Sequence, residues 1–90
     1  MTLAVSTVST FLAAAIDASG RTQQQIADVC GFKRPNMVSM MIHGKVKVPY
    51  KQIKPLARAL RIDHRELARV VIGETEPELL TLLDDLQVNH

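Results

Sequence analysis

Aromatic residues and cysteine are scarce in this sequence of 90 residues. It has no tryptophan, one tyrosine and two phenylalanines, so aliphatic side chains and methionine must fill the core. β-Sheets draw on aromatic and β-branched residues, whereas short packed helices do well with Leu, Ala and Met. The single cysteine, Cys30, cannot form an internal disulfide. A chain of this length builds one small core, and this composition predicts an all-α fold.

Long apolar runs are also missing. No stretch approaches the roughly 20 apolar residues that span a bilayer. The mildly apolar segment from Thr2 to Ile16 lacks a basic residue before its apolar part, and serines and threonines interrupt it. A secretory signal needs a basic start and an unbroken apolar region. We therefore expect no membrane association and a cytoplasmic protein.

The net charge of +2 is distributed unevenly along the chain. Residues 33–69 hold ten of the 11 Lys and Arg residues and have a net charge of +8, whereas residues 70–90 have a net charge of −5. A basic middle beside an acidic end is typical of a polyanion-binding surface with a separate partner-binding tail. Solvated helix faces can also be rich in Lys and Arg, so charge alone leaves both interpretations open.

Apolar spacing and boundary residues predict a compact bundle of five to six helices. Thr22 and Gln25 have the spacing of a capping box, and glycines at 20, 31, 44 and 73 are expected helix ends. A third helix is expected from Pro35 to His43. Asp63 is expected to cap the N-terminus of a fifth helix, and residues 75–78 are expected to cap the N-terminus of a sixth. The residues expected to be buried in the other helices are Val5, Val8, Leu12, Ala15 and Ile16; Ile26, Val29 and Cys30; Ile53, Leu56, Ala57 and Leu60; and Leu67, Val70 and Val71.

The second and third expected helices, joined by a tight turn, form a helix-turn-helix from about Thr22 to Gly44. In such a unit the second helix projects outward and can enter the major groove of DNA. At about 100° per residue, the apolar side chains of the third helix gather on one side. The opposite side carries Asn36, Ser39, Met40 and His43.

These outward residues have the chemistry to read bases. Asn36 can pair with adenine, Ser39 can donate or accept a hydrogen bond, and Met40 can contact a thymine methyl group. Arg34 and Lys33 flank the row, and we include Arg34 among the base-reading residues. The plainer alternative is a polar helix face with no role in reading bases. Lys45 to Val48 alternates at period two, but without a partner strand we expect a loop rather than an extended wing.

The run Thr22-Gln23-x-x-Ile26-Ala27-x-x-x-Gly31, with Val38-Ser39-x-x-x-x-Gly44-Lys45 and Leu56-Ala57-x-Ala59-Leu60, resembles the phage-repressor and Cro (XRE-type) helix-turn-helix family. The resemblance covers about Val5 to Leu67. It implies a lambda-repressor-like bundle that binds DNA, usually as a homodimer on a palindromic operator. The turn before Val38 is one residue longer than the commonest spacing, and Met40 stands where a polar reader is usual.

By position, the resemblance implies that Gln23 touches phosphate or a base edge at a helix N-terminus. It also implies that His43, Lys45 and Lys47 face the DNA backbone. His43 could equally complement the C-terminus of its own helix. Charge adds Lys33 and Lys51 to the phosphate-facing set, whereas Arg58 and Arg65 are expected on solvated faces.

The acidic end is expected to be a helical extension, residues 73–90, attached to a DNA-binding domain of residues 1–72. Leu79, Leu82, Leu83 and Leu86 share one face of its helix. This face predicts dimerisation. The alternative is that the helix folds back over its own bundle.

A DNA-binding repressor or autoregulator is therefore the function that the sequence favours. There are two alternatives: an antitoxin whose C-terminal segment masks a toxin, and a scaffold that binds only protein. The high density of basic residues from Lys33 to Lys54 argues against the scaffold. Neither Cys30 nor the three histidines have the spacing of a metal site, and no nucleophilic set is complete. We expect no enzymatic activity, no metal and no cofactor.

Overall fold

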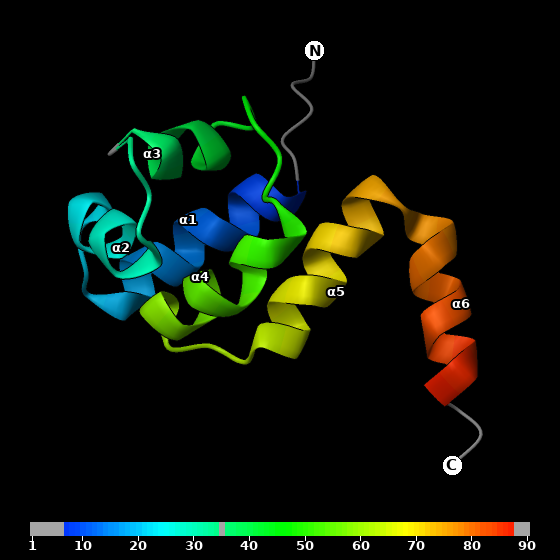
Figure 1. Ribbon diagram of the computed structural model, residues 1–90. Helices are drawn as coiled ribbons and strands as arrows, with labels where there is room; N and C mark the ends of the chain where they lie inside the picture. Colours follow the sequence, from blue (N-terminus) through cyan, green and yellow to red (C-terminus); the bar gives the residue numbers. More distant parts are fainter. Residues whose placement is uncertain (1–6, 35, 88–90) are drawn as a thin grey trace.

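The computed structural model describes residues 7–34 and 36–87, which form six α-helices and one 3₁₀ helix and contain no strand (Figure 1). The all-α fold is the one that the sequence predicts. Lys45 to Pro49 is a loop, as expected, and the 3₁₀ helix η1 that follows it was not predicted. The elements in chain order are α1 Thr7–Ser19, α2 Gln23–Cys30, α3 Met37–Ile42, η1 Tyr50–Gln52, α4 Ile53–Leu60, α5 His64–Thr75 and α6 Pro77–Gln87.

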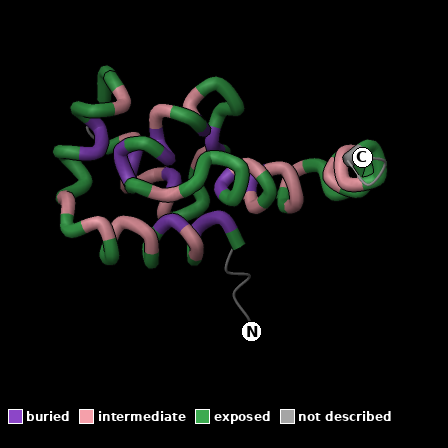
Figure 2. The backbone as a smooth tube through the Cα atoms, turned by 90° about the horizontal axis from the view of Figure 1, so that it is seen from below, coloured by how far each residue is buried: buried purple, intermediate pink, exposed green. Residues whose placement is uncertain are grey.

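Helices α1 to α5 enclose one aliphatic core. Helix α4 lies at its centre, packed against α1, α2 and α5, and five of its eight residues are buried. Figure 2 shows that the buried segments gather in this body, whereas the described residues of α6 are exposed or half-buried. The largest fully buried side chains are Leu12, Ile26, Val38, Met41, Leu56, Leu67 and Val71.

Two predicted helix caps are confirmed. The backbone N–H of Gln25 donates to Thr22 Oγ1 (3.1 Å), and the Thr22 N–H donates to Gln25 Oε1 (2.8 Å), which completes the capping box of α2. At α5, the Arg65 N–H donates to Asp63 Oδ1 (2.9 Å). This backbone hydrogen bond, assisted by the Arg65 side chain, lowers the pKa of Asp63.

The helix α3 is shorter than the sequence predicts. It begins at Met37 rather than at Pro35, which lies outside the described residues, as does Val5. The cause is a tight turn in which the Met37 N–H donates to the Arg34 carbonyl (3.1 Å), so the regular helix starts only after it. At the other end Lys45 N–H bonds the Met40 carbonyl (2.8 Å), and the helix stops at Ile42.

Val29 is not a core residue, contrary to the prediction. Its side chain is 48% exposed, whereas Ile26 and Ala27 are fully buried. On the helical wheel, Ile26, Ala27 and Cys30 define the inner face of α2, and Val29 falls on its margin. Half-burial raises the pKa of the Cys30 thiol, because burial disfavours the charged thiolate. Cys30 therefore packs as a small neutral side chain.

The boundary between α5 and α6 also differs from the prediction. Gly73 lies inside α5, which continues to Thr75. A Cβ at position 73 would lie 3.1 Å from Leu80 Cδ2, so glycine here allows α6 to approach α5 closely. The Thr75 hydroxyl donates back to the Val71 carbonyl (2.6 Å) and does not cap α6, which instead opens with Pro77.

Helix α6 leaves the body as an arm that packs on α5 (Figure 1). It does not fold back over the bundle. Arg69 donates through both terminal nitrogens to the carboxylate of Asp84, with Nη2 to Oδ2 at 3.1 Å. This hydrogen-bonded pair lowers the pKa of Asp84 and raises that of Arg69. Among the described residues, no helix has the length and apolar character needed to cross a bilayer.

Candidate nucleic-acid interface

Two left-handed glycines frame the turn and the helix that follow α2. Gly31 has φ +73, and the next N–H, of Phe32, donates to the Ala27 carbonyl (3.0 Å), which ends α2 and reverses the chain. Gly44 has φ +71 just beyond α3, and a Cβ there would lie 3.3 Å from Ser9 Oγ. Only glycine takes up such backbone angles readily. These two residues therefore fix where α3 begins and ends relative to α1 and α2.

The inner side of α3 is anchored in the core. Val38 and Met41 are each only 2% exposed, and α3 packs against both α1 and α2. This anchoring turns the opposite side outward, where Asn36 and His43 are exposed and Ser39 and Met40 are half-buried. The four outward residues predicted from the helical wheel thus share one surface, held on a fixed backbone.

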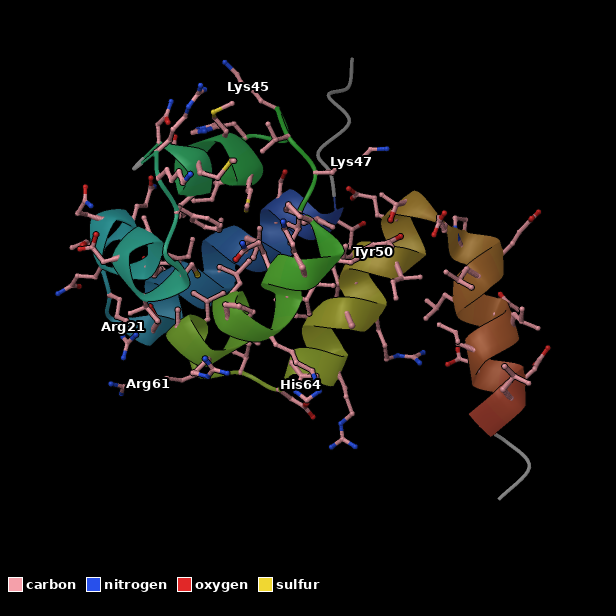
Figure 3. All side chains as sticks on the ribbon, in the orientation of Figure 1. Arg21, Lys45, Lys47, Tyr50, Arg61 and His64 are labelled. Atoms are coloured by element: carbon pink, nitrogen blue, oxygen red, sulfur yellow. The ribbon has the colours of Figure 1, made fainter. Side chains whose placement is uncertain are left out.

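Basic side chains stand before and after α3. Lys33 and Arg34 are exposed in the preceding turn, and Lys45 and Lys47 are exposed in the loop that follows. Among the described residues, the structure gives the ion pairs Arg65–Asp63 and Arg69–Asp84, and neither involves any of these four cations. Figure 3 shows Lys45 and Lys47 on the α3 side of the molecule.

The opposite side of the molecule carries other cations. Figure 3 shows Arg21, Arg61 and His64 on the side of the helical body opposite Lys45. Basic charge alone therefore does not single out one face. The α3 side differs because its cations flank a row of polar and thioether side chains on an outward helix, which is the arrangement that major-groove readers use.

A helix-turn-helix family model matches residues 12–67, from the middle of α1 to Leu67 in α5. The match covers more than half of the chain and includes α2, the turn and α3. The chain belongs to the XRE-type helix-turn-helix family. It is a DNA-binding helix-turn-helix regulator, and α3 is the helix that follows the turn after α2. No match to the chain was found among curated proteins or solved structures.

The helix-turn-helix match ends at residue 67, before α6 begins at Pro77. Gln23 and Lys51, two residues predicted to contact phosphate, lie on other elements, away from α3 and the turn and loop that flank it. Gln23 is exposed as the first residue of α2, and Lys51 is exposed in η1, beyond the buried Val48. Their backbones are held by elements other than α3.

Two hydrogen bonds lie near the regulator's candidate interface. His43 Nδ1 lies 2.8 Å from the Ser39 carbonyl oxygen, which agrees with the alternative in which His43 complements the C-terminus of its own helix. The Tyr50 hydroxyl donates to Glu76 Oε1 (2.8 Å) and joins the start of η1 to the junction of α5 and α6. No local pattern signals this second bond, because the partners are 26 residues apart in the sequence.

Proposed function

We propose that this regulator is a sequence-specific transcriptional repressor that binds a pseudo-palindromic operator as a dimer. It acts on duplex DNA in the cytoplasm, with α3 in the major groove and α6 joining the two subunits. The observation that carries the proposal is the outward row of α3 between two pairs of exposed cations that form no ion pair with another described residue. A regulator of this kind needs base-reading groups for specificity and cations for affinity.

Asn36, just before the first residue of α3, is the residue best suited to read a base. Its amide can pair bidentately with adenine, and its side chain makes no cap hydrogen bond that would compete. Met40 offers a thioether to a thymine methyl group, and Ser39 offers a hydroxyl. Arg34, in the turn just before, is suited to guanine.

Phosphate contacts come from the elements around α3. Lys33, Lys45 and Lys47 have exposed side chains, whose ammonium groups can displace counterions from phosphate. Gln23 adds an exposed amide at the N-terminus of α2, where backbone N–H groups and the helix dipole favour an anion. Lys51, exposed in η1, is a further positively charged side chain for a phosphate contact.

The leucines of α6 support dimerisation. Leu79, Leu82 and Leu86 are 36%, 54% and 61% exposed, and their three- and four-residue spacing is that of a coiled-coil seam. Leu83, the fourth member of the predicted set, is half-buried and lines the groove between α5 and α6 together with Leu80. A two-fold pairing of the arms would set the half-sites about one helical turn apart, roughly 34 Å.

Replacing Asn36 tests the base-reading role. Asn36→Ala should leave the fold intact, because the side chain is exposed, and should cost about 1–3 kcal/mol of specific binding for a bidentate base contact. Selection from a randomised operator library should show relaxed preference at one or two positions of each half-site. The exposed Thr81→Ala on α6 serves as the control and should select the same operator as the wild type. An unaltered preference for Asn36→Ala would remove Asn36 from the set of readers.

A further inference from the structure

His43 is held in one orientation by its own helix. It is exposed at the C-terminal end of α3, with Nδ1 2.8 Å from the Ser39 carbonyl oxygen and 3.4 Å from Ser39 Oγ. A carbonyl oxygen can only accept a hydrogen bond, so Nδ1 carries the hydrogen and donates it. This hydrogen bond to the carbonyl of Ser39, one turn earlier in α3, sets the orientation of the imidazole ring.

This bond decides what the rest of the imidazole can offer. A neutral histidine has one ring N–H and one ring nitrogen with a free lone pair. Because the N–H is used within α3, the neutral ring presents Nε2 as an acceptor. His43 also lies seven residues after Asn36, which is two helical turns, so both side chains belong to the same outward face.

Duplex DNA offers few groups that can donate to such an acceptor. Phosphate and deoxyribose oxygens are acceptors, and so are guanine O6 and N7 and thymine O4. The donors in the major groove are the exocyclic amino groups, N6 of adenine and N4 of cytosine. An acceptor on the outward face of a recognition helix therefore matches these amino groups and not the backbone.

We propose that His43 is a specificity-determining residue that accepts a hydrogen bond at Nε2 from the exocyclic amino group of adenine or cytosine. This role replaces the phosphate contact that the sequence alone implied for His43. A phosphate contact needs a hydrogen on Nε2 as well, and so a protonated ring. The inference rests on the proposed insertion of α3 into the major groove.

The two roles predict opposite results for His43→Ala. Selection from a randomised operator library with the full-length wild type should show a preference for adenine or cytosine at one position of each half-site. In His43→Ala that preference should fall by about two- to tenfold, since a hydrogen bond between neutral groups contributes about 0.5–1.5 kcal/mol. Preferences at the other positions and the salt dependence of binding should be unchanged.

His64→Ala is the matched control, because His64 is an exposed histidine on the side of the helical body opposite Lys45 (Figure 3). It should bind and select like the wild type. A second experiment removes the amino group from the DNA. Purine replaces adenine, or 2-pyrimidinone replaces cytosine, at the selected position. The wild type should lose about two- to tenfold in affinity, and His43→Ala should lose nothing. The base analogue that lowers the affinity of the wild type identifies whether His43 contacts adenine or cytosine.

Three results would overturn the inference. If His43→Ala weakens binding to operator and random DNA equally and reduces the salt slope by about 1 per subunit, His43 contacts phosphate. If it changes neither selection nor affinity, the ring serves only to close α3. If the wild type shows no base preference at any position, the proposed repressor function itself fails, which is distinguishable from loss of the His43 position alone.

Discussion

Leu82→Glu should lower operator affinity by about 10²- to 10⁴-fold while leaving each subunit folded. Leu82 is 54% exposed in the middle of α6, so the substitution costs little in the monomer. In a dimer the same side chain would be buried against the partner arm, where an unpaired carboxylate is strongly unfavourable. Separate subunits then bind half-sites independently, and the gain from joining two sites in one molecule is lost.

Sedimentation and operator titration together measure this effect. Leu82→Glu should sediment as a monomer, whereas Thr81→Glu, which adds the same charge on the side of α6 opposite the leucine face, should remain a dimer with wild-type affinity. A wild type that is monomeric at tens of micromolar, an order typical of such assays, and still binds its operator tightly would contradict dimerisation through α6. The α6 leucines would then favour the antitoxin alternative, in which a different protein covers them.

Leu67→Ala should lower the free energy of unfolding by about 3–5 kcal/mol. Leu67 is 0% exposed on α5, which packs against both α1 and α4, so truncation removes buried contacts and leaves a cavity. This is a large part of the total stability that small domains have, about 5–15 kcal/mol. Chemical denaturation followed by circular dichroism gives the change directly.

Val29→Ala is the aliphatic control for this loss. Its side chain is 48% exposed, and its removal should change the free energy of unfolding by less than about 0.5 kcal/mol. If Val29→Ala were as destabilising as Leu67→Ala, the exposed placement of Val29 at the margin of α2 would be wrong. The sequence pattern, which predicted a core position, would then be right.

Most of the helical layout could be predicted because its signals are local. The capping box at Thr22 and the cap at Asp63 depend on side chains that bond the backbone two or three residues away. The outward face of α3 follows from the period of the helix, and burial of Val38 and Met41 confirms it. These features need no knowledge of the rest of the fold.

The errors come from tertiary packing. Gly73 has the residue type of a helix end, but the close approach of Leu80 explains why it lies inside α5. Val29 has the spacing of a buried position in α2, but the helices that pack against α2 determine which of its faces is buried. The direction of the α6 arm depends on Arg69–Asp84 and on packing against α5, which join segments that no short pattern relates.

The salt dependence of DNA binding tests the central claim most directly, because the claim is that the α3 surface binds duplex DNA. Each phosphate neutralised on duplex DNA contributes about −0.9 to the slope of log K against log salt. Three to four contacts per subunit, a rough count from Lys33, Lys45, Lys47 and Lys51, give a dimer slope between about −5 and −7. Lys45→Ala and Lys47→Ala should each weaken binding to operator and random DNA alike and reduce the slope by about 1 per subunit.

Arg61→Ala is the matched control, since Arg61 is exposed on the side of the helical body opposite Lys45 (Figure 3). It should leave both affinity and slope unchanged. The measurement is a titration of mixed genomic DNA, beginning near 50 mM salt, where such binding is strong, and extending upward. The account predicts binding that weakens steeply with salt and depends on Lys45 and Lys47 but not on Arg61. No detectable binding near 50 mM salt, or equal dependence on all three cations, would contradict it.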